Sequence, residues 1–278
     1  MRDGLRAVGA VLTFYGGVTL GTLPLLLAVP SGWLVGRRGL AVQTAALMTG
    51  ALIAYAILLA RRWATLRAVG WPGRKQAVAG MARGGAIGLL MAAVALIAAV
   101  VVGSARLSIT GESLTAYAAS AVPLLGLLLA AALAEELLFR GYPLARLSVT
   151  FGKVPASLGL AALFALAHLA NPATSAIGLV NIGLASLVLS AAFFTPGGLP
   201  AAWGLHLGWN AGLGLGADAP VSGVQLGLPA LEFASGEPSW LTGGSFGPEG
   251  GIVSSLVMAG VLMWLIRNNS RLIQERAR

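Results

Sequence analysis

Apolar runs long enough to cross a lipid bilayer recur along the whole chain. A transmembrane helix needs about 20 mostly apolar residues, and this sequence offers such stretches repeatedly between short polar connections. Hydrophobic residues make up 57% of the chain and charged residues only 10%, whereas a soluble domain carries about a quarter charged residues. Most of the surface therefore does not meet water. The sequence predicts an all-α, polytopic membrane helical bundle that forms a single domain over residues 1–278.

Eight membrane-spanning helices are expected. Their approximate limits are residues 8–28, 42–60, 86–103, 117–149, 155–170, 176–194, 200–215 and 252–266. The fifth, seventh and eighth are short, as is common where a bundle encloses a cavity or thins the bilayer. The first run is longer than the apolar region of a signal peptide and lacks a small-residue cleavage site, so it is expected to remain as a helix.

The basic residues set the orientation. With the amino terminus in the cytoplasm, fifteen of the 18 Lys and Arg residues fall on the cytoplasmic side, where Arg140, which lies within a span, is counted only by its place in the chain. The positive-inside rule then predicts an integral protein of the cytoplasmic (inner) membrane, with both termini and the tail at 267–278 in the cytoplasm. The net charge of +9 is accordingly interpreted as contact with the lipid bilayer, and no nucleic-acid partner is expected.

Three further features of the sequence limit how the chain is organised. The loop at 216–251 is rich in Gly and Pro and carries acidic but no basic residues, which fits the outer face, where it is either a lid or a connector. The spacing of Gly204, Gly208 and Gly212 favours close helix packing. The chain has no cysteine, which excludes disulfides, thiolate metal sites and a cysteine nucleophile.

Ionisable side chains inside spans are costly and are functional candidates by default. Of nine acidic residues only Glu135 and Glu136 lie within a span, and the two histidines, His168 and His206, both do. If Gly152 is the tip of the hairpin between the fourth and fifth helices, Glu136 and His168 lie equally far from it, about 24 Å along each helix. The fourth helix would then continue past Pro143, which is expected to kink it.

Helical spacing suggests a division of roles. Glu136 and Arg140 are four residues apart and can pair, which leaves Glu135 without a guanidinium in an apolar setting, where a carboxylate suits general-base catalysis. His206 and Asn210 share one helix face and are donors for a developing oxyanion.

His168 can hold the same water as Glu135. Other readings remain open. A histidine inside a membrane often only links helices, the Glu136–Arg140 pair can simply lock a bundle, and Phe164 can be packing. Glu135, His168 and His206 would also make a two-histidine, one-carboxylate zinc site. We expect no metal, since the His-Glu-x-x-His helix is missing, and keep zinc as the alternative.

Taken in order, Glu135-Glu136-x-x-x-Arg140, Phe164-x-x-x-His168 and His206-x-x-x-Asn210 resemble the three motifs of the CPBP family, the CAAX proteases and bacteriocin-processing enzymes (Abi, or type II CAAX prenyl endopeptidases). The motif-bearing core covers about residues 114–215, with the motifs on the fourth, fifth and seventh helices.

This resemblance implies an intramembrane cavity and a glutamate-type endopeptidase. In it Glu135 activates a water with help from His168, His206 and Asn210 stabilise the oxyanion, and Glu136, Arg140 and Phe164 support the site. The expected partner is a membrane-associated peptide or protein substrate, without a commitment to prenylation. The alternatives are a non-catalytic scaffold or immunity protein, a zinc-dependent peptidase, and a proton-coupled transporter, for which the chain shows no inverted repeat.

Overall fold

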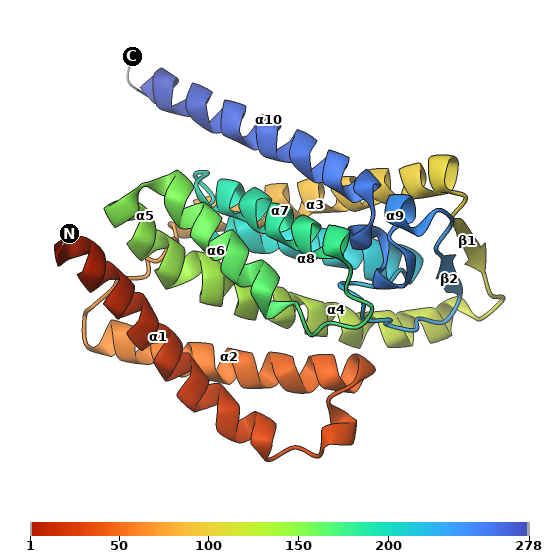
Figure 1. Ribbon diagram of the computed structural model, residues 1–278, viewed down its shortest axis with the longest axis horizontal. Helices are drawn as coiled ribbons and strands as arrows, with labels where there is room; N and C mark the ends of the chain where they lie inside the picture. The colour runs from red at the N-terminus through yellow and green to blue at the C-terminus, as the bar shows by residue number, and fades with distance from the viewer. Residues whose placement is uncertain (1, 277–278) are drawn as a thin grey trace.

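The computed structural model describes residues 2–276 and the side chains of residues 2–269. It is a bundle of long helices with a small elaboration at one end (Figure 1). Six of the described helical segments are long and apolar enough to cross a membrane. The predicted all-α polytopic membrane bundle is therefore confirmed.

Each predicted span overlaps a helix, and the fourth runs through three consecutive helical segments. The helices are α1 (Arg2–Leu27), α2 (Gly36–Ala60), α3 (Arg74–Gly103), α4 (Leu114–Glu136), α5 (Ala145–Phe151), α6 (Lys153–Ala167), α7 (Ala176–Phe193), α8 (Gly198–Ala217), the short α9 (Ser239–Thr242) and α10 (Ile252–Arg276). A π-helical segment, η2 (Leu137–Leu144), joins α4 to α5, and 3-10 turns lie at Ser31–Trp33, Gly244–Phe246 and Pro248–Gly250.

Helix lengths differ from expectation at two places. α6 is short as predicted, with 15 residues, but α8 has 20 and α10 has 25. Hydropathy detects only the apolar part of a helix, whereas α10 continues through the polar stretch after Ile266. The predicted cytoplasmic tail is thus helical to Arg276, and its last two residues lie outside the described residues.

Helices α3 and α8 pack face to face through glycines. A Cβ atom at Gly204 or Gly208 would collide with the backbone of α3, and one at Gly84 or Gly88 would collide with the backbone of α8. The predicted close packing through Gly204, Gly208 and Gly212 is therefore present, because backbones this near each other leave no room for side chains. This packing fixes the helix that carries His206.

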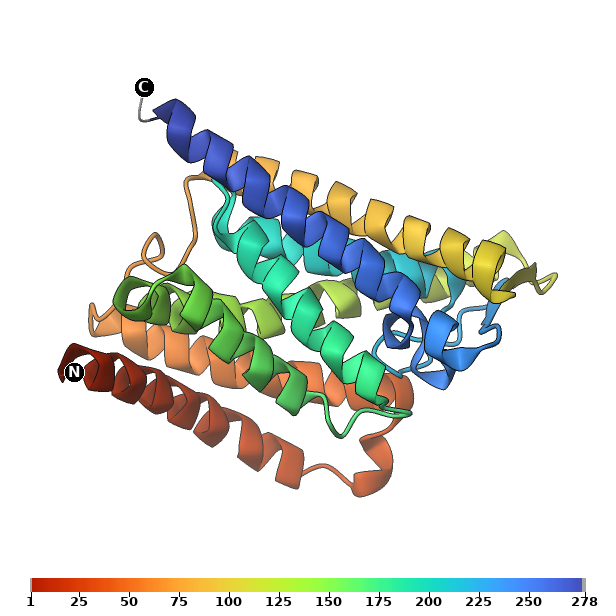
Figure 2. The ribbon, with the colours of Figure 1, turned by 45° about the horizontal axis from the view of Figure 1, so that its top comes forward.

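Helices α1 and α2 form a hairpin on one side of the bundle (Figures 1 and 2). α2 packs on α4, and α1 reaches α5. An aromatic cluster joins them to η2: the Phe14 ring lies 5.5 Å from the rings of both Tyr55 and Tyr142. The hairpin therefore abuts the segment that immediately follows the two glutamates.

The long loop after α8 is folded. Strand β2 (Leu231–Ala234) pairs antiparallel with β1 (Arg106–Ile109), with Arg106 opposite Ala234. The end of the loop is tied to α7, because Asn181 Nδ2 donates to the carbonyls of Glu249 (2.7 Å) and Gly251 (2.9 Å). The loop is thus a structured cap on this end of the bundle, rather than an open connector.

Candidate active site

The glutamate pair sits where the helix changes its winding. Glu135 and Glu136 end α4, and residues Leu137–Leu144 follow in π-helical geometry. Pro143 has no N–H to donate, and Gly141 adopts a non-helical ψ of −110°. The kink predicted at Pro143 is therefore present, in the form of a widened turn that frees backbone groups inside the membrane.

Two tyrosines from other helices satisfy these freed groups. The Tyr55 hydroxyl on α2 donates to the Leu137 carbonyl (2.9 Å) and accepts from the Tyr142 N–H (2.7 Å). The Tyr15 hydroxyl on α1 donates to the Leu138 carbonyl (2.9 Å). Unpaired backbone groups are costly in a lipid environment, so these hydroxyls stabilise the unusual turn.

Glu136 is the hub of a buried charged network. Its Oε1 accepts from Arg140 Nη1 at 3.1 Å and from His206 Nδ1 at 2.8 Å, and the side chains of Glu136 and Arg140 are fully buried. The guanidinium also stacks on Phe164, with Cζ 4.5 Å from the ring centroid. The predicted Glu136–Arg140 pair is present, and the structure adds His206 to it.

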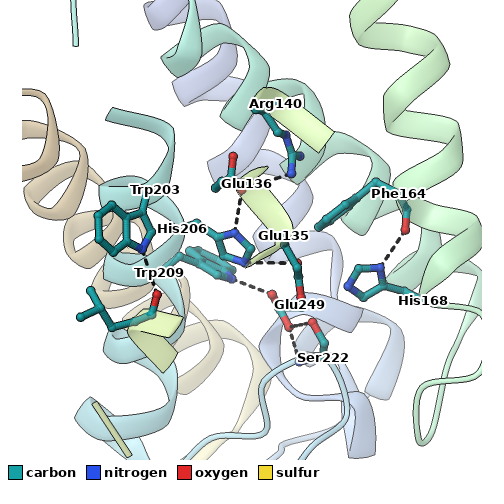
Figure 3. Close-up of polar contacts among 11 residues, drawn as sticks. Glu135, Glu136, Arg140, Phe164, His168, Trp203, His206, Trp209, Ser222 and Glu249 are labelled. Carbon is teal, nitrogen blue, oxygen red and sulfur yellow. Dashed lines mark hydrogen bonds and ion pairs between the residues drawn. The ribbon is translucent and has the colours of Figure 1, made fainter. Parts of the chain in front are cut away.

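Glu135 faces the other side of the same histidine. Its Oε2 lies 3.8 Å from His206 Nε2, and its side chain keeps 27% of its surface exposed. Figure 3 shows His206 reaching from α8 between the two glutamates. The two adjacent carboxylates therefore differ sharply: one is sealed against a guanidinium and the other is accessible.

His168 lies at the end of α6. Its Nδ1 is 2.7 Å from the Phe164 carbonyl, and the two rings are 4.5 Å apart. A carbonyl only accepts, so Nδ1 carries the proton, and Nε2 of a neutral ring remains an acceptor. In the view of Figure 3, His168 stands on the opposite side of Glu135 from His206.

The hairpin turns at Gly152, as the sequence argument assumes. The equal depth of Glu136 and His168 stays a prediction. Gly152 separates α5 from α6 with a φ of +89°, so it is the tip. Arg140 and Phe164 are each twelve residues from it, and they are in contact. The helices on either side of Gly152 therefore stay level despite the π-helical turn.

Helix α8 brings Asn210 to the same region, buried and one turn beyond His206. The neighbouring Trp209 connects it to the loop after α8: Trp209 Nε1 donates to Glu249 Oε1 at 2.7 Å. Both the N–H and the hydroxyl of Ser222 donate to the other oxygen of Glu249. Glu249 thus links Trp209, the neighbour of Asn210, to Ser222 (Figure 3).

Sequence reasoning missed Glu249, Tyr15 and Tyr55. Glu249 was grouped with the acidic residues of a loop, and nothing in its neighbours signals burial. The tyrosines carried a usable signal, since a hydroxyl within an apolar span needs a partner. Their partners, more than eighty residues away, could not be named from the sequence.

The fit to a metal was tested on the donors. Among the described residues, no three or more His, Asp or Glu side chains are grouped so as to hold a metal ion. Glu135 and His206 approach each other, but His206 Nδ1 is engaged by Glu136. The alternative zinc set of Glu135, His168 and His206 therefore stays a prediction, and no step is assigned to a metal.

These observations define a class: a polytopic membrane protein that holds carboxylates, histidines and an asparagine together within its helices. The family model described as Type II CAAX prenyl endopeptidase Rce1-like matches residues 117–212, the stretch that contains all the predicted site residues. The match covers about a third of the chain and supports the resemblance of this core to the CPBP family of CAAX-type membrane proteases. No curated protein matches the sequence.

Proposed function

We propose that this chain is an intramembrane endopeptidase that cleaves a membrane-associated peptide or protein through a water activated by Glu135. One observation carries the proposal: an accessible carboxylate, Glu135, stands 3.8 Å from a histidine that a buried Glu136–Arg140 pair orients. That distance is too long for a direct hydrogen bond, so both groups remain available to a water or a substrate atom.

Glu135 is the general base. It takes a proton from the water as the water oxygen attacks the carbonyl carbon of the scissile bond, and the carbonyl oxygen becomes the oxyanion. When the tetrahedral intermediate collapses, the C–N bond breaks and Glu135 returns the proton to the leaving amine. His168, whose Nδ1 donates to the Phe164 carbonyl, offers Nε2 as an acceptor for the same water.

His206 and Asn210 are the donors for the oxyanion. Two carboxylates and one guanidinium leave this buried group with one excess negative charge, which a protonated His206 balances. The protonated ring gives Nδ1–H to Glu136 and presents Nε2–H to the reacting carbonyl oxygen. Asn210, one turn along α8, supplies a second N–H donor.

The test compares Glu135→Gln with the wild type in proteoliposomes. The control variant is Glu112→Gln, which removes an exposed carboxylate just before α4. The probe is an internally quenched peptide with a farnesylated CAAX terminus, the substrate class in the family's description, together with the same peptide without the lipid. Loss of a general base should lower the rate roughly 100-fold or more, while the control should retain it.

A second measurement detects the cleavage of substrates that differ from these peptides. New protein termini are mapped in membranes from cells that express the wild type or Glu135→Gln. Termini that require Glu135 support the peptidase. Full activity of Glu135→Gln, or the absence of both peptide cleavage and Glu135-dependent termini, would overturn the proposal in favour of a non-catalytic scaffold.

A further inference from the structure

A cavity of about 460 Å³ lies apart from the catalytic residues, where α3, the turn between α7 and α8, and α10 meet. Ala201 and Leu205 line it from α8, on the face of α8 that packs against α3. His206 turns instead toward Glu136. Figure 2 shows α10 running alongside α3 over this region. The cavity is therefore separate from the proposed active site, although one helix serves both.

The cavity is amphipathic. Ile87 and Leu205 belong to its apolar wall, whereas Lys75 and Arg83 are the ionisable residues that line it in the part of the chain the structure describes. Both basic side chains are exposed, and no ion pair found among the described residues uses either of them. The site thus combines an apolar groove with two positive charges that lack a carboxylate partner there.

The length of α3 places these charges at the bilayer surface. Its 30 residues extend about 45 Å, whereas the hydrocarbon core is about 30 Å thick. Residues 84–103 contain no charged side chain, and these twenty residues alone cover that thickness. The first ten residues of the helix, through Arg83, therefore lie in the headgroup layer, while Ile87 lies one turn inside the hydrocarbon.

The opposite wall has the composition of an interface. Trp264 on α10 is 52% exposed, and Asn268 lies one turn farther along the same lining. Tryptophan favours the headgroup level of a bilayer because its ring is apolar and its N–H is polar. The two walls therefore present matching layers, polar toward the surface and apolar below.

We infer that this cavity binds a phospholipid with an anionic headgroup. Lys75 and Arg83 contact the phosphate region, and an acyl chain lies between α3 and α10 along Ile87 and Leu205. The volume is within the range of small-molecule sites, about 300–1,000 Å³, and basic pockets between transmembrane helices suit anionic lipids. A lipid seated there braces the α3–α8 pair, and hence the helix that carries His206.

The test is lipid retention by native mass spectrometry of the full chain in detergent. The protein is titrated with palmitoyl-oleoyl phosphatidylglycerol and, separately, with the phosphatidylcholine of the same chains. The site variant is Lys75→Ser with Arg83→Ser. Its matched control is Arg61→Ser with Arg62→Ser, which removes two exposed charges elsewhere. A third variant, Ala79→Phe, fills the cavity without a change in charge.

We expect tighter binding of phosphatidylglycerol than of phosphatidylcholine. The site variant should weaken that binding about 30-fold, because it removes two positive charges near the bilayer surface. Ala79→Phe should also weaken it, because the larger side chain fills the cavity. The control should bind like the wild type. Equal binding of both lipids, equal loss in the control, or unchanged binding by the site variant would overturn the inference. Displacement of the lipid by inorganic phosphate alone would instead indicate a free-anion site.

Because this readout needs no catalysis, it is independent of the proposed peptidase. Loss of lipid binding with an intact Glu135-dependent activity would leave the catalytic proposal standing, and the reverse would leave the lipid site standing. The melting temperature of each variant, measured without added lipid, identifies any that has simply failed to fold.

Discussion

The bundle contains two regions that contribute to the candidate active site in different ways. The motif-bearing core, from α4 to α8, supplies the carboxylates, histidines and guanidinium, and it is the part that matches a known family. The hairpin of α1 and α2 lies outside that match and supplies no charged group to the candidate site. It does supply Tyr15 and Tyr55, which bond to the turn that follows the glutamates.

The difference separates chemistry from positioning. Residues that react are conspicuous because a charge inside a membrane is costly and needs a reason. Residues that hold the reacting segment are neutral and resemble ordinary packing. The core therefore shows what the site can do, whereas the amino-terminal hairpin explains how a widened, π-helical turn remains stable beside it.

The largest effect should come from the core itself. Arg140→Ala leaves the fully buried Glu136 without its guanidinium, and we expect a loss of stability of about 3–5 kcal/mol. The measurements are the yield and the melting temperature in detergent, with Arg146→Ala on α5 as the control. A purified Arg140→Ala protein with wild-type yield and melting temperature would contradict this prediction.

A second substitution, at Glu136, separates the cost of the unpaired charge from the cost of lost packing. Glu136→Gln added to Arg140→Ala removes the stranded charge and should recover part of the stability. It should not recover activity, because His206 loses the carboxylate that orients it. A double variant as unstable as Arg140→Ala would show that lost packing around the guanidinium, rather than the unpaired charge, dominates.

The next effect tests the amino-terminal hairpin. Tyr55→Phe removes the hydroxyl that donates to the Leu137 carbonyl and accepts from the Tyr142 N–H. Both bonds lie inside the bundle, so the substitution should cost about 1–3 kcal/mol of stability. Thermal unfolding measures this cost. Tyr117→Phe is the control, because it removes one hydroxyl bond, to Leu215, at a distance from the turn.

Geometry at the site can be measured separately. The chain has no natural cysteine, so cysteines placed at positions 135 and 206 can be joined by a short bifunctional thiol reagent. We expect Tyr55→Phe to reduce the yield of that crosslink and Tyr117→Phe to leave it unchanged. Equal yields in both backgrounds would mean that Tyr55 contributes stability without positioning Glu135.

A smaller effect is expected at the loop after α8. Glu249→Ala removes the acceptor for Trp209 Nε1 and for Ser222, at a cost of about 1–2 kcal/mol, since water can reach part of the opened loop. Limited proteolysis should cleave within residues 218–251 faster than in the wild type. Glu232→Ala, at an exposed position of strand β2, is the control, and equal cleavage of the two variants would contradict this prediction.

The smallest effect should follow metal removal. A mechanism based on a glutamate-activated water predicts that chelation with EDTA or 1,10-phenanthroline leaves the rate unchanged. The measurement is peptide cleavage before and after dialysis against each chelator. Inactivation reversed by added zinc would indicate a metallopeptidase in which Glu135, His168 and His206 bind the metal.

Much of the core could be predicted because its signals are local. Apolar runs located the spans, and Gly152 was correctly taken as the tip of the hairpin between α5 and α6. The four-residue spacing of Glu136 and Arg140 was enough to predict their pair. The ends of α8 and α10 were missed, because a helix does not stop where its hydropathy falls.

The sequence by itself determined which residues must be accommodated within the membrane, since the cost of a charge there depends only on the residue and its apolar neighbours. Only the tertiary structure decided which of these residues pair with one another. His206 could have met either glutamate, and the rotation of α8 against the glycines of α3 directs Nδ1 to Glu136 and Nε2 toward Glu135. Glu249 and Tyr55 join the site through contacts between segments far apart in the chain, and periodicity and spacing carry no record of such contacts.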